Sequence, residues 1–597
     1  MIWGREKIVQ SATALWTETA TPLPRPPKKE FDNIPALRTI HENPHLFKVS
    51  TPIDVDRFEK LLSSHPNQEF VRSVCIGLRE GFWPFADTHH DTYPTTLDFS
   101  DRPVKSEREF NFLKEQIRCE VDKGRYSPSF GPDLLPGMYS MPIHAIPKPG
   151  TDKLRLVTDH SAGEFSLNSM IEKDDIAGVT LDNVQDLANA LRIFRKDVGS
   201  DADLVLWKAD VSEAYRHIPM HPLWQIKQVV TFNGERRVDW RNVFGGRASL
   251  RNFHAFMALV IWIAVMKLLL LVFIYVDDSF SYEKSGALTF YKGYQKLLPS
   301  GLTKLLNLWD FIRLPHEERK QVFGPVLPII GFEVDPNRMT ATMSAKSRAT
   351  LIDQIEKFAK YNSRRSLKDF QRLAGNINWS LNVYPLLRPG LSSLYSKMSG
   401  KRHSHALIWV NRAIVDELLW ITRLLRVSDG VFFLNSNSWS QWSLPVNTLS
   451  VFCDASGVGM AFWYPSLNTG YKSHLPSTAP KNTIFFFEAL AVCSAIHDAA
   501  PRLRRGDHLA IFTDNMNTVD IFHSLATTPQ YNEILKSAIN IIFFAGIDFR
   551  VFHIAGVENI IADHLSRNHD SLALGIVPHL KIKSFIPPQD AMGVVSS

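Results

Sequence analysis

Two adjacent carboxylates, Asp277 and Asp278, follow the apolar run Leu268–Ile274. Successive side chains of a strand point to opposite faces, so both acids can share one site only if the chain turns between or directly after them. Two anions at the tip of a buried strand lose hydration and repel each other, and a bound cation offsets both costs. Mg²⁺ prefers such oxygen ligands. Taken alone, the stretch is equally consistent with an Asp-rich turn after a core strand.

A third carboxylate follows a second apolar strand. Asp210 comes shortly after Leu204–Trp207 and could join the two adjacent acids around two metal ions. Such a site needs anionic oxygens that bridge two cations and keep an attacking and a leaving oxygen in line. Five residues further on, the ring of Tyr215 could lie beneath an incoming sugar.

A predicted hairpin supplies positive charge. Polar and apolar residues alternate over Ser140–Val157 around a Lys-Pro-Gly-Thr-Asp turn at 148–152, which favours two antiparallel strands. This places Lys148, Lys153 and Arg155 on a projecting ribbon. They are either the surface charges of a solvated hairpin or cations that close over a triphosphate.

Four more acids stand at element ends late in the chain. Two β-rich runs end in carboxylates, a helical pattern begins with one, and a further strand, Phe549–Phe552, leads to the last. These acids are Asp454, Glu488, Asp514 and Asp563. Such a strand–helix–strand–helix series is typical of a hydrolase that uses two metal ions.

Composition indicates the kind of protein that must position these groups. A length of 597 residues predicts three or four domains, and 45% hydrophobic with 21% charged residues is typical of a soluble globular protein. A net charge of +6 is mild, so any nucleic-acid contact must come from local basic surfaces. Four cysteines without paired spacing indicate a reducing compartment, and charges at residues 5–7 argue against a secretory signal.

One apolar segment approaches the length of a membrane span. Ala258–Val276 is interrupted only by Lys267. Its β-branched and aromatic residues at 272–275 and the aspartates that follow favour a buried helix and then a core strand. We therefore expect no membrane association.

The motifs from Asp210 onward resemble, in order and spacing, those of reverse transcriptases, and the resemblance covers roughly residues 142–334. It is carried by Asp210-Val-Ser-Glu-Ala-Tyr215, Phe244-Gly245-Gly246, Tyr275-Val-Asp-Asp278 and Ile330-Gly331-Phe332. It implies a right-hand fold with fingers, palm and thumb. Palm metal ligands would be Asp210, Asp277 and Asp278, the last being the weaker ligand.

The same resemblance implies further roles. Lys148 and Arg155 would contact the nucleotide triphosphate, and Tyr215 would exclude a 2′-hydroxyl. Gly245 would lie behind the template–primer, and Lys320 would protonate the leaving pyrophosphate.

Two further features of the resemblance concern strand handling. Ile330-Gly331 would be the turn that grips the primer end. This chain departs from most relatives in having Gly246 and Leu250 where they have Leu and Pro, which bears on template contact rather than on the metal site.

The late acidic set resembles a ribonuclease H domain. The resemblance makes its four acids metal ligands and gives His553, ten residues before Asp563, a part in product release. The ending Ala562–Arg567 resembles retrotransposon versions of this domain.

These features predict an α+β multidomain chain, a right-hand polymerase followed by an α/β ribonuclease H-like domain. The expected parts are a flexible leader (1–50), an accessory helical region (51–124), fingers and palm (125–335), a helical thumb or connection (336–445), ribonuclease H (446–568) and a tail (569–597).

The expected activity is RNA-directed DNA synthesis with degradation of the RNA strand of hybrids, using two Mg²⁺ or Mn²⁺ ions per site. Expected partners are an RNA template, a DNA primer, RNA–DNA hybrid and dNTPs, inside the cell in cytoplasm, nucleus or both. The phrase Arg155–Ser161 and the lack of an Asp-Thr/Ser-Gly protease signature favour a DIRS-like retrotransposon. Two alternatives remain: a domesticated or decayed element protein that binds nucleic acid without catalysis, and a structural RNA-binding component of a ribonucleoprotein.

Overall fold

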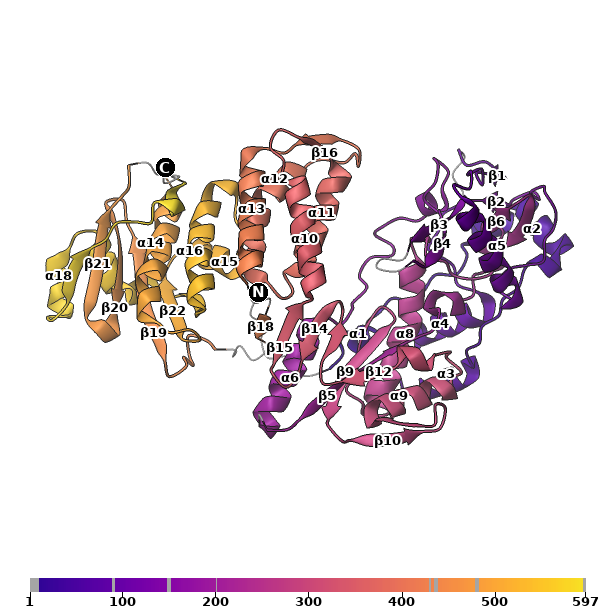
Figure 1. Ribbon diagram of the computed structural model, residues 1–597, viewed down its shortest axis with the longest axis horizontal. Helices are drawn as coiled ribbons and strands as arrows, with labels where there is room; N and C mark the ends of the chain where they lie inside the picture. The colour runs from indigo at the N-terminus through magenta and orange to yellow at the C-terminus, as the bar shows by residue number, and fades with distance from the viewer. Residues whose placement is uncertain are drawn as a thin grey trace. The chain divides into compact units, whose positions relative to one another are not determined.

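The computed structural model describes residues 10–88, 92–147, 152–199, 201–428, 431–433, 439–477 and 483–593. They form two compact units, one ending at Ile330 and one beginning at Gly331 (Figure 1). This boundary lies close to the one predicted at residue 335. The second unit contains both the helical region and the late acidic segment.

The central sheet of the first unit is antiparallel, with strand order β12-β5-β9-β8. Its strands are β5 (Leu204–Asp210), β8 (Phe273–Tyr275), β9 (Asp278–Lys284) and β12 (Val322–Gly324). In β5 the side chains of Leu206, Trp207 and Ala209 are fully buried. The predicted strands that end in carboxylates are thus core strands.

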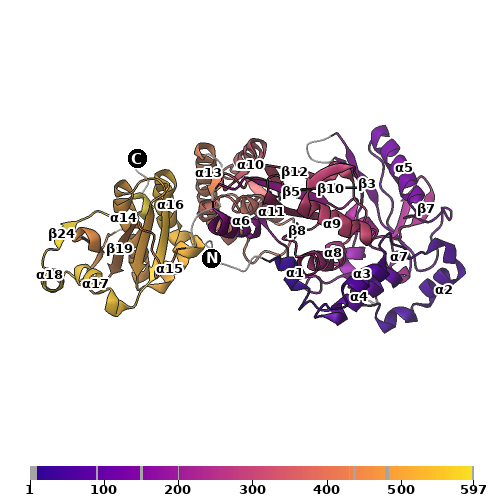
Figure 2. The ribbon, with the colours of Figure 1, turned by 90° about the horizontal axis from the view of Figure 1, so that it is seen from below.

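Helix α8 (Ser249–Met266) is almost completely buried. Around it Figure 2 shows α1 (Ala12–Trp16), α3 (Val55–Leu61) and α4 (Gln68–Glu80). The predicted buried helix followed by a core strand is confirmed by α8 and β8. By length and composition, α8 and Ile484–Arg502 could each cross a membrane, but this is weak evidence because 83% and 67% of their apolar windows are buried in the protein.

A second sheet and a separate hairpin complete the region of the predicted fingers. The sheet has β1 (Leu97–Asp98), β2 (Tyr139–Ser140), β6 (Val229–Phe232) and β7 (Glu235–Val238); the hairpin has β3 (Ile143–Pro147) and β4 (Leu154–Thr158). Beside them lies α5 (Glu107–Asp122), which Ser106 caps. The hairpin is confirmed, but Lys148 lies in its turn, outside the described residues.

Helix α2 (Ile34–Glu42) packs against α7 (Pro222–Gln225) and shares a core cluster with β6 and β7. The other elements of this unit are α6 (Val184–Val198), α9 (Ser300–Phe311), the hairpin β10 (Leu288–Tyr291) with β11 (Lys296–Pro299), and β13 (Leu327–Ile329).

The prediction of a flexible leader is wrong for residues 10–50. Ser11 caps α1, Ala14 and Leu23 are buried, and Trp16 packs edge-on against Phe70. These apolar contacts follow no helical period, which is why the pattern of the sequence did not reveal them. Helices α3 and α4 likewise share the hydrophobic core of β5 and α8, so residues 51–124 are not a separate accessory region.

The second unit begins with a small sheet and a helical layer. The sheet has β14 (Phe332–Asp335), β15 (Thr340–Met343) and β18 (Val431–Phe433), and β16 (Arg364–Ser366) pairs with β17 (Leu407–Trp409). The helices are α10 (Ala345–Phe358), α11 (Leu367–Ser380), α12 (Ser392–Met398) and α13 (Arg412–Val427). Helix α11 begins with a reciprocal capping box formed by Ser366 and Asp369.

A six-stranded sheet forms the rest of this unit, in the order β23-β22-β19-β20-β21-β24. Its strands are β19 (Thr448–Ala455), β20 (Gly459–Tyr464), β21 (Thr469–His474), β22 (His508–Thr513), β23 (Asp548–His553) and β24 (Lys581–Ser584). Strand β20 runs antiparallel to both of its neighbours, β19 and β21, whereas β22 runs parallel to β19 and β23 runs parallel to β22.

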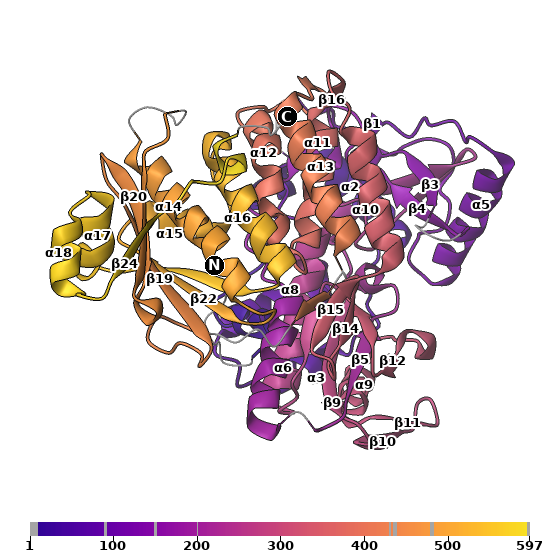
Figure 3. The ribbon, with the colours of Figure 1, turned by 60° about the vertical axis from the view of Figure 1, so that its left-hand side comes forward.

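Helices cover both faces of this sheet (Figure 3). One face carries α14 (Ile484–Ala499), α15 (Met516–Ser524) and α16 (Asn532–Ala545); the other carries α17 (Ile560–Ser566) and α18 (Asp570–Ile576). The predicted separate tail is wrong for its described residues, because β24 pairs with β21 and Ala573 packs in the core beside Leu565.

Candidate active sites

The first carboxylate site, which we define as Asp210, Asp277 and Asp278, is built on the turn between β8 and β9. Tyr275 pairs with Asp278, so the turn consists of Val276 and Asp277, one residue earlier than the sequence predicts. Val276 has φ 60°, a conformation that β-branched residues rarely adopt. A backbone held in such a conformation indicates a segment that its surroundings constrain.

Strand register brings Asp210 to this turn. Asp210 lies directly opposite Asp278 on the neighbouring strand, where like charges repel. Two lysines offset this repulsion: Lys320 Nζ lies 3.1 Å from Asp210 Oδ1, and Lys208 Nζ lies 2.9 Å from Asp278 Oδ2. Sequence reasoning found Lys320 but missed Lys208, although its spacing of two from Asp210 indicates the same face of β5.

Burial and charge perturb these acids. Burial raises the pKa of Asp277 to about 6, with further contributions from the charges of Asp210 and Asp278. Burial also raises the pKa of Asp210, although the hydrogen bond from Lys320 opposes this. An all-oxygen donor set that repels itself fits a divalent cation. Within the described chain, however, these three aspartates do not form a compact three-ligand group.

A cavity of about 370 Å³ opens beside Asp210 and Asp277. Among the residues that line it are Arg155, Phe244, Lys320, Glu213 and Arg216. The guanidinium of Arg155 stands 5.2 Å from the centre of the Phe244 ring. Arg155 therefore lines a cavity next to the carboxylates, and its contact with a nucleotide triphosphate stays a prediction.

Tyr215 packs beside this cavity. Its ring centre lies 4.8 Å from that of Phe244 and 5.3 Å from that of Phe253. Burial and, to a smaller extent, the charge of Asp277 raise the pKa of Tyr215 to about 12. The ring thus lies close to the carboxylate site, and its role in sugar selection stays a prediction.

Gly245 has a structural reason to be glycine. A Cβ at this position would lie 2.0 Å from the carbonyl oxygen of Thr158, and the Gly245 carbonyl accepts a 2.9 Å hydrogen bond from Asn168 Nδ2. Contact with template–primer remains a prediction. The same holds for the predicted primer grip, where Ile330 and Gly331 have φ values of 50° and 82°.

Sequence reasoning missed a buried ionic network that borders the cavity. Arg216 Nη2 lies 2.7 Å from Glu120 Oε2, and Arg216 Nη1 lies 3.0 Å from Asp239 Oδ2. Glu213, at φ 52°, pairs with Arg125 at 2.7 Å. The partners are up to 96 residues apart, so no local pattern could reveal them.

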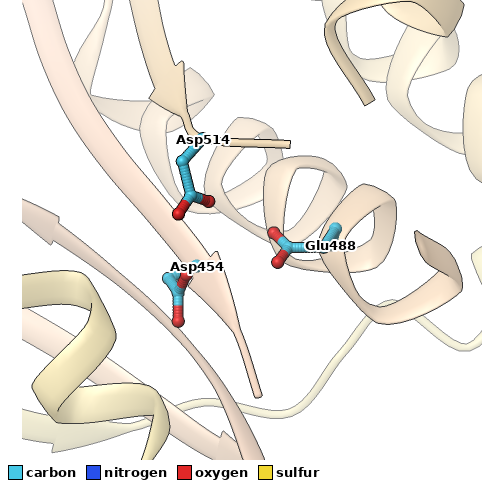
Figure 4. A group of neighbouring side chains, drawn as sticks. All are labelled: Asp454, Glu488 and Asp514. Atoms are coloured by element: carbon cyan, nitrogen blue, oxygen red, sulfur yellow. The ribbon is translucent and has the colours of Figure 1, made fainter. Parts of the chain in front are cut away.

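The second carboxylate site, which we define as Asp454, Glu488 and Asp514, lies on the six-stranded sheet. Phe452 of β19 pairs with Phe512 of β22, so Asp454 and Asp514, each two residues further, lie side by side. Figure 4 shows Glu488 pointing from α14 toward both. Oxygen atoms of the three lie within 4.8 Å of one another. The structure thus brings together three of the four predicted acids.

This second site also fits a divalent cation. Burial raises the pKa of Glu488 to about 9, with contributions from the charges of Asp454 and Asp514. Burial raises the pKa of Asp454 to about 7 against an opposing hydrogen bond from Ser566. Glu488 Oε2 is buried and has no hydrogen-bond partner among the described residues. A buried anionic oxygen without a donor is costly unless a cation contacts it.

The other two predicted residues lie outside this group. Asp563, on α17, accepts a 2.7 Å hydrogen bond from Arg567 Nε, although its charge still raises the pKa of Asp454. His553 is the last residue of β23 and pairs with Thr513, the residue that precedes Asp514. The His553 side chain is exposed.

Two supporting residues were missed. Ser566 Oγ donates to Asp454 Oδ2 at 2.6 Å, and Asn559 Nδ2 donates to the carbonyl of Cys453 at 2.8 Å. Their partners lie 112 and 106 residues away in the chain, so no local pattern indicates these contacts.

No family model and no curated protein matches the sequence. Three solved structures of the foamy viral protease–reverse transcriptase are similar to the chain. The dRH form with double-stranded DNA is 14% identical, with a TM-score of 0.41, covering 84% of this chain and 82% of the other. The complex with RNA/DNA hybrid is 14% identical, with a TM-score of 0.38, covering 85% of this chain and 63% of the other. A complex with double-stranded DNA is 15% identical, with a TM-score of 0.40, covering 85% of this chain and 98% of the other.

Proposed function

We propose that the protein synthesises DNA on an RNA template at the first carboxylate site and cleaves the RNA strand of RNA–DNA hybrids at the second. The carrying observation is that one chain holds two all-oxygen acidic sites at strand ends. The first lies beside a cavity that Arg155 and Lys320 help to line, and the second keeps a buried carboxylate oxygen that has no hydrogen-bond partner among the described residues. DNA synthesis on RNA leaves a hybrid, which gives the second activity its substrate.

At the first site, Asp210 and Asp277 would hold Mg²⁺ or Mn²⁺, two ions in all, with Asp278 as the weaker ligand. Bound ions supply charge stabilisation for the attacking and leaving oxygens. Arg155, together with Lys148, binds the triphosphate of a dNTP. Lys320, already at the edge of the site, donates a proton to the leaving pyrophosphate.

The nucleotide sugar lies against Tyr215 in this proposal. The ring is fixed by two neighbouring aromatic rings, so it cannot move aside easily for a 2′-hydroxyl. This supports a preference for deoxyribonucleotides.

At the second site, Asp454, Glu488 and Asp514 would hold two ions of the same kind, with Asp563 completing the set. Ser566 orients Asp454 by its hydrogen bond. His553, exposed beside Asp514, assists release of the cleaved strand. The chemistry is hydrolysis of a phosphodiester.

The proposed biological setting is replication of a retrotransposon of the DIRS-like lineage, inside the cell in cytoplasm, nucleus or both. Local basic surfaces would hold the template, the primer and the hybrid by phosphate contacts.

The test measures both activities on one preparation of the full chain. Primer extension uses a DNA primer on an RNA template with dNTPs, and cleavage uses a labelled RNA–DNA hybrid, each with Mg²⁺, with Mn²⁺ and with EDTA. We expect both activities with either ion and none with EDTA. Tight hybrid binding without either activity would refute catalysis and indicate a nucleic-acid-binding protein.

A further inference from the structure

Strand β8 lies at the edge of the central sheet, yet the N–H and C=O groups of Ile274 both find a hydrogen-bond partner in one residue, Asp182. Edge strands expose N–H and C=O groups that need partners. The Ile274 N–H donates to Asp182 Oδ2 at 2.9 Å, and the Ile274 carbonyl accepts from the Asp182 N–H at 3.2 Å. Ile274 lies three residues before Asp277. Asp182 thus holds the strand that leads directly into the first carboxylate site.

The same carboxylate binds the N-terminal segment. Ser11 Oγ donates to Asp182 Oδ2 at 2.6 Å, and the Thr13 N–H donates to Asp182 Oδ1 at 3.2 Å. Thr13 Oγ1 accepts from the Asp182 N–H at 3.2 Å and donates to the carbonyl of Thr180 at 3.1 Å. Asp182 is fully buried. The two carboxylate oxygens of Asp182 therefore join the N-terminal segment, which is 169 or more residues away in the chain, to β8.

The N-terminal segment is itself anchored in the core. Helix α1 packs against α8, which lies beside it in Figure 2. The Trp16 ring lies 5.5 Å from Phe70 and 5.1 Å from His254, and Arg251 stands 4.9 Å over it. Ser11 and Thr13, at the start of this helix, are fixed with it. Asp182 therefore ties β8 to a segment that packs into the core.

The turn after β8 needs such restraint. Val276 has φ 60°, and strained backbone persists only where its surroundings over-determine it. Pairing with β9 holds one edge of β8, and Asp182 holds the other at Ile274. Loss of the second restraint lets the strand end shift and moves Asp277.

We propose that Asp182, together with Ser11 and Thr13, is a positioning residue for the first carboxylate site, which it serves by fixing β8 and the turn that carries Asp277. The inference rests on the proposed function of that site. Asp182 itself contacts no reacting group.

Two variants break this tie and a third serves as the matched control. Asp182→Asn keeps the shape but replaces one acceptor with a donor that faces other donors. Thr13→Val removes one hydroxyl from the tie. Thr17→Val removes a similar buried hydroxyl from the same segment, one that donates to the Ala14 carbonyl and contacts His65 without touching Asp182 or β8.

The experiment compares hydrogen exchange of the full chain with its two activities. In Asp182→Asn we expect exchange of the Ile274 amide to be faster by about tenfold or more, because its charged acceptor is lost. We expect kcat for primer extension to fall by roughly 10- to 100-fold through misplacement of Asp277, with KM for dNTP changed by less than about twofold. Thr13→Val should show the same changes to a smaller extent. Thr17→Val should show neither, and hybrid cleavage should persist in all three.

The outcomes separate the two claims. Unchanged exchange at Ile274 in Asp182→Asn, or a kcat no lower than that of Thr17→Val, would overturn the positioning role. Absence of primer extension in the wild-type protein would refute the proposed polymerase function instead, and exchange at Ile274 would still decide whether Asp182 holds β8.

Discussion

Glu488→Gln is the most informative single substitution, because it should change stability and activity in opposite directions. Glu488 is buried, faces Asp454 and Asp514, and keeps one carboxylate oxygen without a hydrogen-bond partner among the described residues. Glutamine preserves the shape and removes the charge. Without a cation the wild-type site should therefore be a source of instability that the variant lacks.

The magnitude follows from the pKa of Glu488, which burial and the neighbouring acids raise from 4.5 to about 9. Below pH 4.5 both the folded and the unfolded state hold the proton, and the group has no effect on stability. Between pH 4.5 and about pH 9 the unfolded state has released the proton and the folded state has not. The free energy of unfolding therefore falls by about 1.4 kcal/mol per pH unit over this range. At pH 7 the cost is on the order of 3 kcal/mol.

The assay is thermal unfolding of the metal-free protein at pH 5.5, 7 and 8, with and without added Mg²⁺. With EDTA we expect the variant to unfold at a higher temperature than wild type, by a margin that grows with pH. Mg²⁺ should stabilise the wild type and have a much smaller effect on the variant. Hybrid cleavage by the variant should fall by at least about 100-fold, while primer extension stays near wild type.

Glu417→Gln is the matched control. Glu417 is a buried carboxylate of the same unit, but it accepts hydrogen bonds from Ser393 and Asn532. Its replacement should destabilise the protein equally with and without Mg²⁺. A Glu488→Gln protein that cleaves hybrid at the wild-type rate, or gains no stability in EDTA, would refute the assignment of this site. Loss of both activities would indicate that the variant misfolds and would refute its use as an isosteric change.

Three further substitutions test other residues. Asp277→Asn should abolish primer extension, because it removes the charge of a proposed metal ligand, and should leave hybrid cleavage at the second site intact. The fold should survive, because one charge is lost from a self-repelling set. Near-normal extension would exclude Asp277 as a ligand. Tyr215→Ala should raise the incorporation of ribonucleotides relative to deoxyribonucleotides in a competition assay, and an unchanged ratio would leave the ring as core packing. Gly245→Ala should lower stability by about 3 kcal/mol in chemical denaturation, because the added methyl would meet the Thr158 carbonyl; unaltered stability would show that the backbone here adapts.

The failures of sequence reasoning have physical causes. Residues 10–50 look unstructured because Ala14, Trp16 and Leu23 follow no helical or strand period, yet each fills part of a core made by distant elements. Residues after 568 look featureless because a short strand such as β24 is stable only beside the sheet that it extends.

Local patterns in the sequence were enough to predict the core strands and the acids at their ends. Apolar runs that end in Asp210, Asp277 and Asp514 indicate core strands with acids at their ends, because local periodicity and charge are written in adjacent residues. Which of these acids lie together depends on how the strands pair. Strand register places Asp210 opposite Asp278, parallel pairing brings Asp454 beside Asp514, and Asp182 reaches β8 from 92 residues away. Such pairings depend on hydrogen bonds and packing between segments far apart in the chain, which no local pattern of the sequence contains.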